Sequence, residues 1–239
     1  MATLQNKTVV VVGGSSGIGF AVAIGALQSL ASVVIIASSN KSRIDDAIAR
    51  LKAYNLPGEV RGEVLDAKDS NAVKTFAVAI GTVDHIVWTS GDVPKDEHGS
   101  GVLPYSNVGS VDQGQGIFTV RFWGPFILAK HAKFHPGLVG QRPAPGSTLA
   151  SSVTTALEGL TRGLALDLAP VRVNLICPGL LTDNMFGERK EQVIKTYSEK
   201  ILLKRGGDPS ECAEAYLFVM KCGYITGQTI NIEGGYLLL

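Results

Sequence analysis

The residues near the N-terminus that could do chemistry form a glycine-rich turn. The run Val9-Val10-Val11-Val12 is followed by Gly13-Gly14-Ser15-Ser16-Gly17-Ile18-Gly19 and then by apolar residues at helical spacing. Glycines allow a backbone to approach a pyrophosphate closely, and a helix N-terminus offers free N–H groups with a partial positive charge. Because the glycines lie between a predicted strand and a predicted helix, the pattern indicates a dinucleotide-binding turn rather than an ordinary one.

The end of the next apolar run, Ile35-Ile36-Ala37, indicates which dinucleotide would bind. It is followed by hydroxyl, amide and cationic side chains, those of Ser38, Ser39, Asn40, Lys41, Ser42 and Arg43. An NAD site usually has a carboxylate here for the ribose 2′-hydroxyl, whereas a 2′-phosphate needs hydrogen-bond donors or a cation. No acid occurs before Asp45, so the sequence favours NADP(H), and Ser39 or Asn40 could in addition cap the next helix. Asp66 closes the third predicted strand, where a carboxylate can accept from the adenine amino group or cap a helix.

Composition and charge exclude several classes of protein. The 239 residues carry a formal net charge of +1 with scattered lysines and arginines, so there is no basic surface for nucleic acid or an anionic membrane. The apolar runs are too short to span a membrane, and the first residues lack the pattern of a signal peptide. Three cysteines make neither a disulfide framework nor a metal cluster. We therefore expect a cytoplasmic protein without a metal site.

Short β-branched runs alternate with longer segments of helical period, which is typical of βαβ units with a parallel sheet buried on both faces. The predicted strands are Thr8–Val12, Ser32–Ala37, Glu59–Leu65, His85–Thr89, Val171–Cys177 and Thr229–Ile232. The predicted helices are Gly17–Leu30, Ser42–Tyr54, Ser70–Ile80, Val111–His131, Thr148–Leu168, Arg189–Leu203 and Pro209–Lys221. Asp208 before Pro209 is an N-cap signal, and Asp69 or Ser70 can cap the third helix. The sequence predicts an α/β fold, one Rossmann-like domain over residues 1–239 with a doubly wound parallel sheet and helices on both faces.

Two stretches do not follow this alternation. Residues 92–116 are polar and rich in glycine, which favours a loop. Residues 134–146 contain Pro136, Pro143 and Pro145 at the place where the alternation requires another central strand. That strand is not visible in the sequence.

Several motifs together resemble the short-chain dehydrogenase/reductase family over nearly the whole chain. Besides the glycine turn, these are Thr89-Ser90-Gly91, the helix segment Ala156-Leu157-Glu158-Gly159, the turn Pro178-Gly179 followed by Thr182, and the final pair Gly234-Gly235. The resemblance implies NADP(H) as cofactor, a small-molecule substrate, a homodimer or homotetramer, and a substrate lid at about residues 183–204. The residue types at the strand ends and the resemblance together predict cofactor contacts from Gly13, Ser15, Ser16, Gly17, Ile18, Gly19, Ser38, Ser39, Asn40, Arg43, Asp66, Ala67, Ser90, Gly91, Pro178, Gly179 and Thr182.

The catalytic set of the family is not found at the matching positions. In the family, a Tyr and a Lys four residues later on the long helix, with a Ser and an Asn from neighbouring elements, carry proton transfer to the substrate oxygen. Here the Tyr and Lys positions are Ala150 and Thr154, the Ser position lies near Gly137, and the Asn position is Arg121. An alanine cannot replace a phenol whose pKa is lowered by an ammonium group. Arg121 cannot transfer protons, but it can hold a carboxylate or an enolate by forked hydrogen bonds, or form a structural ion pair.

An arginine at this position, without the Tyr and Lys, is similar to a divergent fungal branch of the family whose NADPH-dependent reductases also shape a Diels–Alder cyclisation. An iminium carbon already carries positive charge, so hydride delivery to it needs no proton donor. In that branch an Asp in the proline-rich loop works with the arginine, but the matching residue here is Ala144. Three interpretations stay open. They are a reductase of a carbonyl or iminium substrate in secondary metabolism with Arg121 as the candidate catalytic residue, a non-redox cyclase that uses the nicotinamide pocket, and a non-catalytic NADP(H)-binding protein.

Overall fold

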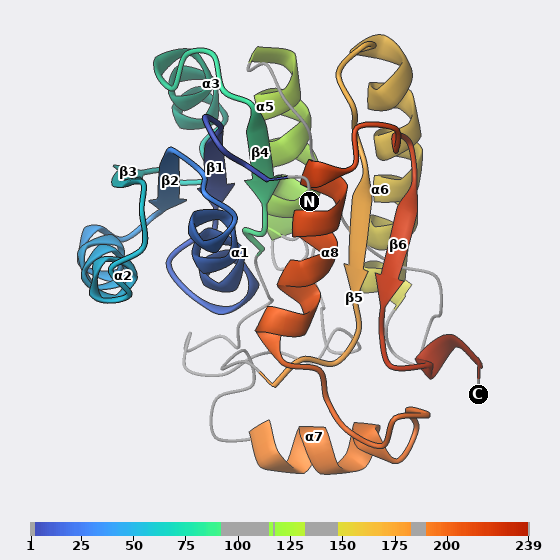
Figure 1. Ribbon diagram of the computed structural model, residues 1–239. Coiled ribbons are helices and arrows are strands. Elements are labelled where there is room, and N and C mark those ends of the chain that lie inside the picture. The colour runs from blue at the N-terminus through green and yellow to red at the C-terminus, as the bar shows by residue number, and fades with distance from the viewer. Residues whose placement is uncertain (1–2, 92–114, 117, 132–147, 183–189, 239) are drawn as a thin grey trace.

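The computed structural model in Figure 1 describes residues 3–91, 115, 116, 118–131, 148–182 and 190–238. The strands are β1 (Thr8–Val12), β2 (Val33–Ser38), β3 (Glu59–Val64), β4 (His85–Trp88), β5 (Leu175–Pro178) and β6 (Thr229–Ile232). The helices are α1 (Gly17–Gln28), α2 (Lys41–Ala53), α3 (Ser70–Ala79), α5 (Gly124–His131), α6 (Thr148–Asp167), α7 (Lys190–Ser198) and α8 (Pro209–Lys221). A π-helical turn, η2, spans Thr119–Trp123, and a 3-10 turn, η4, spans Tyr236–Leu238. The predicted alternation is confirmed, and β1, α8 and β6 have the predicted bounds.

All strand pairs of the described residues are parallel. β1 lies between β2 and β4, with Val10 opposite Ile35 and Ile86, and β3 adds to β2, which gives the order β3-β2-β1-β4. β5 and β6 pair in a second sheet. The four valines of β1 are each at most 1% exposed, because a central parallel strand is covered on both faces. This is the Rossmann-like arrangement that the sequence predicted.

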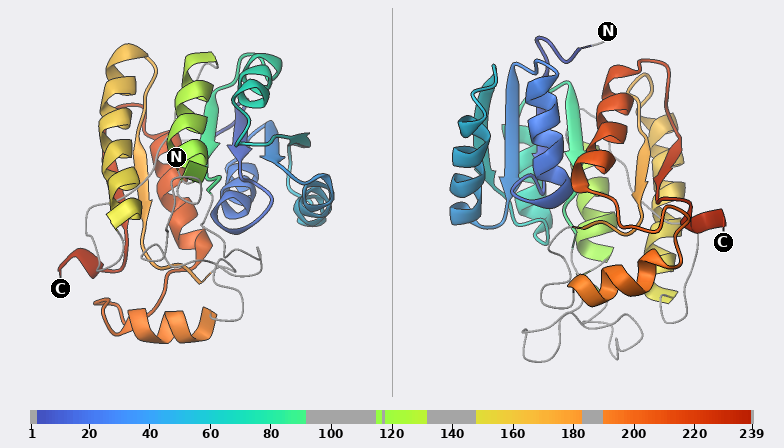
Figure 2. Two further views of the ribbon diagram at one scale, coloured as in Figure 1. Left: turned by 180° about the vertical axis from the view of Figure 1, so that it is seen from behind. Right: turned by 60° about the horizontal axis from the view of Figure 1, so that its bottom comes forward.

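Helices cover both faces of the sheets (Figures 1 and 2). α1, α2 and α8 pack around one core, which includes Val9 and Val11, while α3, α5 and α6 pack around a second core on the other face. The first core contains both Val87 of β4 and Ile176 of β5, so apolar packing joins the two sheets. The further central strand considered for residues 134–146 lies outside the described residues. Within the described ranges, no helix is both long enough and apolar enough to cross a membrane.

Side chains cap three helix N-termini at positions that the sequence indicated. Asp208 precedes Pro209 at the start of α8, and its carboxylate together with that of Glu211 forms a capping box. Asp69 caps α3, and Asn40 caps α2, each through a side-chain oxygen. These caps supply partners for N–H groups that a helix leaves unpaired at its N-terminus.

β5 begins later than the predicted start at Val171. The Val173 N–H donates to the Thr226 hydroxyl at 3.0 Å, and the Gly227 N–H donates to the Val173 carbonyl at 2.6 Å. The polar backbone before Leu175 is therefore paired with a loop, and only the residues from Leu175 onward form the ladder with β6. The apolar pattern of the sequence did not distinguish these two kinds of pairing.

The helix predicted for residues 111–131 contains a π-helical turn in its described part. The Gly124 N–H donates to the Thr119 carbonyl, five residues back rather than four. Pro125 has no N–H, so the α-helical bond to the carbonyl of Arg121 cannot form, and a wider turn precedes α5. This turn contains Arg121, whose guanidinium lies against Gly91 after the carboxyl end of β4.

His85 on β4 is only 8% exposed. Burial lowers the pKa of its imidazole to about 4, with Asp84 opposing the shift and Arg172 and Lys7 adding to it. The folded protein therefore holds His85 neutral at pH 7, whereas in the unfolded chain it takes up a proton near its ordinary pKa of 6.5.

We expect the free energy of unfolding to decrease as the pH falls from 6.5 to about 4, because the unfolded state binds a proton there that the folded state does not. The decrease amounts to ~3 kcal/mol at most. Denaturant titrations at several pH values measure it, with His85→Gln as the comparison. The variant should lose this part of the pH dependence and keep the part due to carboxylates, and equal slopes in the two proteins would contradict the prediction.

Candidate functional site

The glycine turn connects β1 to α1 at the carboxyl ends of the parallel strands. Gly13 has a φ of 89°, and its N–H donates to the Ala37 carbonyl of β2 at 2.8 Å. Ser16 is the N-cap residue of α1, and within the described part of the chain its side chain makes no capping hydrogen bond. The N–H groups of the first helical turn are therefore available to another acceptor. A bound phosphate requires this arrangement.

The turn packs closely against the residues that follow β4. The Thr89 N–H and hydroxyl both donate to the Val12 carbonyl, at 2.8 and 3.0 Å. A Cβ on Gly19 would lie 2.4 Å from the Gly13 oxygen and 2.5 Å from Thr89 Oγ1, and a Cβ on Gly13 would lie 2.7 Å from the Ser90 nitrogen. These distances leave no room for a side chain, so both glycines are required by close backbone approach.

Three of the predicted 2′-phosphate contacts lie together at the end of β2. The Ser15 hydroxyl of the glycine turn donates to the Ser38 hydroxyl at 3.2 Å, and the Arg43 guanidinium donates to the Ser39 hydroxyl at 3.4 Å. The Asn40 side chain accepts from the Arg43 N–H at 3.0 Å and so caps α2. Ser38, Ser39 and Arg43 therefore form one polar group beside the turn.

Asp66 and Ala67 follow β3, whose Val64 lies opposite Ser38 in the sheet. The Asp66 carboxylate accepts from the Lys68 N–H at 2.9 Å, and α3 is capped by Asp69 instead. The helix-cap role considered for Asp66 is therefore wrong. Its contact with an adenine amino group stays a prediction.

The guanidinium of Arg121 lies against Gly91 at the opposite end of the predicted cofactor site. A Cβ on Gly91 would lie 2.8 Å from Arg121 Nη2 and 3.0 Å from its Cζ. The preceding segment is fixed, because the indole N–H of the buried Trp88 donates to the Ser90 carbonyl at 3.1 Å. Gly124 follows η2 and packs on the Trp88 ring, where a Cβ would lie 2.4 Å from the ring. The fold thus brings together two residues thirty positions apart, Gly91 and Arg121.

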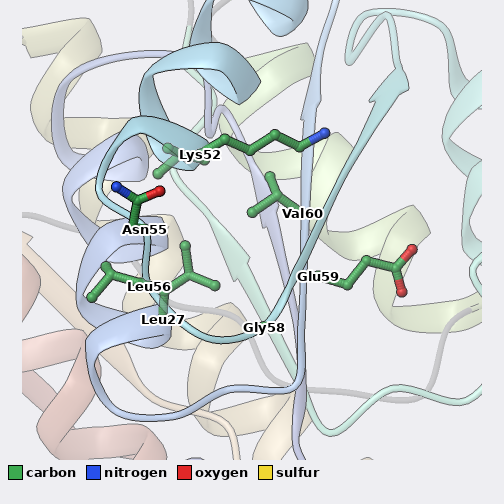
Figure 3. Close-up of a pocket in the computed structure, with 8 residues that line it drawn as sticks. Leu27, Lys52, Asn55, Leu56, Gly58, Glu59 and Val60 are labelled. Atoms are coloured by element: carbon green, nitrogen blue, oxygen red, sulfur yellow. The ribbon is translucent and has the colours of Figure 1, made fainter.

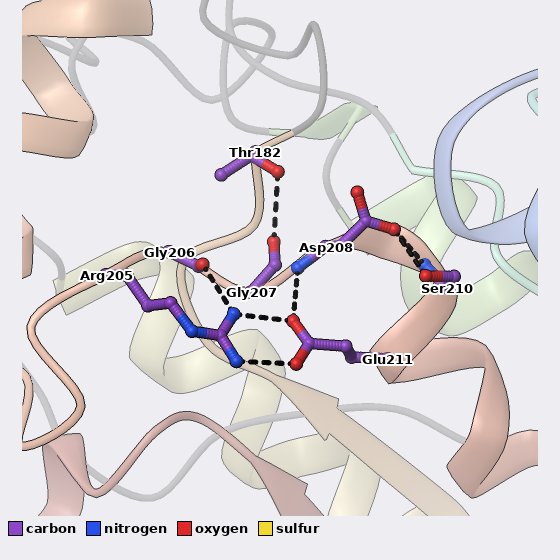
Figure 4. Close-up of polar contacts among 7 residues, drawn as sticks. All are labelled: Thr182, Arg205, Gly206, Gly207, Asp208, Ser210 and Glu211. Carbon is purple, nitrogen blue, oxygen red and sulfur yellow. Dashed lines mark hydrogen bonds and ion pairs between the residues drawn. The ribbon is translucent and has the colours of Figure 1, made fainter.

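The loop after β5 carries the remaining predicted cofactor contacts. Pro178 ends β5, and the Gly179 N–H donates to the Ile232 carbonyl of β6 at 2.9 Å. Thr182 donates from its N–H and from its hydroxyl to the Gly207 carbonyl, at 2.8 and 3.3 Å (Figure 4). The loop is therefore held by β6 on one side and by the segment before α8 on the other.

The helix α6 contains Ala150 and Thr154, the predicted Tyr and Lys positions. Its 20 residues, Thr148–Asp167, include neither a tyrosine nor a lysine. Thr154 is half-buried on it, and Val153 and Leu157 pack with Phe118 and Phe122 from the region of η2. The face of α6 that meets η2 is thus apolar.

The predicted substrate lid, residues 183–204, is described from residue 190 onward. α7 ends at Ser198 rather than at the predicted Leu203. The Leu203 N–H donates to the Gly234 carbonyl at 3.1 Å, and Ile201 is 2% exposed. The end of the lid segment is therefore packed on the C-terminal glycine pair.

A cavity of about 520 Å³ lies at the other end of β2 and β3 (Figure 3). Its lining consists of Leu27, Leu51, Lys52, Asn55, Leu56, Gly58, Glu59 and Val60. Because Glu59 pairs with Val33 at the start of β2, the cavity is a strand length away from Ser38 and the predicted cofactor contacts. Asn55 and Gly58, which lie between α2 and β3 in this lining, have φ values of 50° and 112°.

Comparisons with known proteins agree with this fold. The family model of an SDR-like Rossmann domain matches residues 1–239, and the chain belongs to the short-chain dehydrogenase/reductase family, whose members bind a nicotinamide cofactor. Short-chain dehydrogenase/reductase ucsE of an Acremonium species is 36% identical over 265 residues, which cover 98% of this chain and 97% of the relative. Short-chain dehydrogenase/reductase malC of Malbranchea aurantiaca is 31% identical and covers 98% of this chain and 96% of its own. The solved structure of MalC Reductase/Diels-Alderase from Malbranchea aurantiaca has a TM-score of 0.86 at 30% identity, covering 99% of this chain and 98% of that one.

The close approach at Gly19 predicts that Gly19→Ala destabilises the protein by ~1–3 kcal/mol, because the new methyl group meets backbone that cannot move away freely. Denaturant unfolding measures the effect. Gly163→Ala is the matched control within a helix, since a Cβ on Gly163 meets nothing within 4 Å. The control should stabilise the protein by up to ~1 kcal/mol. Equal stabilities for the two variants would contradict the prediction.

Proposed function

We propose that the protein is an NADPH-dependent reductase that delivers hydride to the carbonyl or iminium carbon of a small molecule in secondary metabolism, without a Tyr–Lys acid–base pair. The observation that carries this proposal is the position of the Arg121 guanidinium against Gly91, beside an α6 that has no Tyr or Lys. Membership of the short-chain dehydrogenase/reductase family and the similarity to fungal members support the proposed class of reaction.

The described residues fit a bound dinucleotide, because the glycines at 13 and 19 form a cradle that a Cβ would fill. The glycine turn would hold the pyrophosphate, Ser38, Ser39 and Arg43 the 2′-phosphate, and Asp66 and Ala67 the adenine. Ser90, Gly91, Pro178, Gly179 and Thr182 would contact the nicotinamide half. The bound cofactor supplies the hydride. The assignments in the glycine turn and after β4 and β5 follow the family's motifs, whereas those of Ser38, Ser39, Arg43 and Asp66 follow from the types of side chain at the strand ends.

Arg121 would act by electrostatics rather than by proton transfer. A guanidinium stays charged at every pH at which proteins fold, so it donates hydrogen bonds but neither gives nor takes a proton in the reaction. It would hold an oxygen atom of the substrate next to the reacting carbon and stabilise negative charge that develops there. An iminium carbon needs no proton donor, and the oxygen of a reduced carbonyl would take its proton from water. The absence of Tyr and Lys from α6 supports this division of roles.

The similarity to MalC favours a second candidate, a cyclase that uses the same pocket without redox chemistry. The solved structure of that relative is called a reductase and Diels-Alderase. Turnover of a substrate without oxidation of NADPH would favour this candidate. Binding of NADPH without turnover on any carbonyl or imine would favour a non-catalytic role.

We also propose a cytoplasmic homodimer or homotetramer, in which the elements around α5 and α6 meet a second copy.

The polar group at the end of β2 predicts that NADPH binds more tightly than NADH. Arg43→Ala should weaken NADPH binding by about tenfold and change NADH binding little, because the guanidinium would pair only with the 2′-phosphate. Tryptophan fluorescence quenching and the shift of the melting temperature measure both affinities. Lys52→Ala removes an equal charge from the far end of α2 and should leave the preference unchanged. If NADPH gives neither signal with the natural protein, the proposed function is wrong.

The proposed role of Arg121 predicts that Arg121→Met lowers kcat by about a hundredfold, since one preorganised donor to developing charge is lost. The affinity for NADPH should stay the same, because the cofactor contacts are intact. Consumption of NADPH on a panel of ketones, aldehydes and cyclic imines measures the rate. Arg162→Met on the exposed side of α6 is the control and should retain full activity. Unchanged turnover of Arg121→Met would exclude the role.

A further inference from the structure

The segment between α7 and α8 is held by an ion pair with two parallel hydrogen bonds (Figure 4). Arg205 Nη1 and Nη2 donate to Glu211 Oε2 and Oε1 at 2.7 and 2.6 Å. Arg205 Nη1 also donates to the Gly206 carbonyl at 3.2 Å, and Glu211 Oε2 also accepts from the Asp208 N–H at 2.8 Å. The Arg205–Glu211 pair therefore fixes the peptide groups on both sides of Gly207.

Gly207 in turn holds the loop that follows β5. Its N–H donates to the Leu180 carbonyl at 2.9 Å, and its carbonyl accepts from the Thr182 N–H at 2.8 Å. The neighbouring Gly206 is buried, and a Cβ on it would lie 3.0 Å from Thr182 Cγ2. Since the two backbone segments contact each other directly, a displacement of Gly207 moves Thr182 with it.

The pair stays ionised over the range in which the protein would work. The hydrogen bond from Arg205, followed by that from the Asp208 N–H, lowers the pKa of Glu211 to about 2. The ion pair therefore does not respond to physiological changes in pH.

We propose that Arg205 and Glu211 are positioning residues for the nicotinamide half of the cofactor, acting through Gly207 on Thr182. This inference rests on the proposed function, in which Thr182 contacts the cofactor. The pair lies beyond the carboxyl end of β5, whereas Ser38, Ser39 and Arg43 lie at the end of β2 in the other sheet. Loss of the pair should therefore weaken contacts with one half of the dinucleotide only.

The test compares NADPH with adenosine 2′,5′-bisphosphate, which has the adenosine half alone. Glu211→Gln and Arg205→Met should each raise the Kd of NADPH by about tenfold and leave that of the bisphosphate unchanged. The double variant should raise the Kd of NADPH by about the same tenfold, because the two side chains act as one unit. Arg205→Lys, which keeps the charge and loses the second hydrogen bond, should have a smaller effect and serves if Arg205→Met does not fold.

Glu59→Gln is the matched control. Arg61 donates to the Glu59 carboxylate at 2.8 and 2.7 Å on β3, so the variant removes the same kind of pair away from the β5 loop, and it should change neither affinity. Unchanged NADPH binding in the variants of Arg205 and Glu211 would overturn the inference and leave the proposed function standing. Equal weakening of both ligands would also overturn it, because that is the result of a general loss of structure. Failure of the natural protein to bind NADPH would overturn the proposed function and this role together.

Discussion

The close contact between the glycine turn and the end of β4 is the constraint on which the rest of the site depends. Gly19 lies so near the Gly13 carbonyl and Thr89 Oγ1 that a methyl group on it would fall 2.4 and 2.5 Å from these oxygens. Thr89 itself is fixed by two hydrogen bonds to the Val12 carbonyl. Three segments of the chain, the end of β1, the start of α1 and the end of β4, are thereby held in one place. The other segments that would contact a dinucleotide are positioned relative to this contact.

One consequence of this constraint concerns Arg121. Gly91 follows the end of β4 by three residues, and the π-helical turn in front of Pro125 carries the Arg121 guanidinium to that glycine. A π-helical turn within a helix often occurs at a functional site, because it changes the direction of a side chain without breaking the helix. α6 contains neither a tyrosine nor a lysine, and the side chain that lies against Gly91 is the Arg121 guanidinium.

The second sheet depends on α8 in a similar way. Along its length α8 packs on α1, so it connects the β5–β6 sheet with the four-stranded sheet through a shared apolar core. Near its N-terminus Glu211 braces the segment that holds the β5 loop. At its C-terminus the carbonyls of Val219 and Met220 accept from Arg172, which fixes the chain that leads into β5. One helix thus positions β5 from both ends.

The sequence by itself determined the order of the elements, the glycine turn and the cap at Asp208, because each of these depends on neighbouring residues. It left the cap of α3 open between Asp69 and Ser70, and the structure has Asp69. It did not determine where β5 begins, since the Val173 backbone pairs with Thr226 and Gly227, more than fifty positions away. The cavity at the far end of β2 and β3 was missed for the same reason, because its walls come from α1, α2 and β3 together. The position of Arg121 against Gly91 and the brace of Thr182 by Arg205 and Glu211 were likewise decided only by the tertiary structure. Contacts between distant segments depend on how helices and strands pack, and no local pattern of residues encodes that packing.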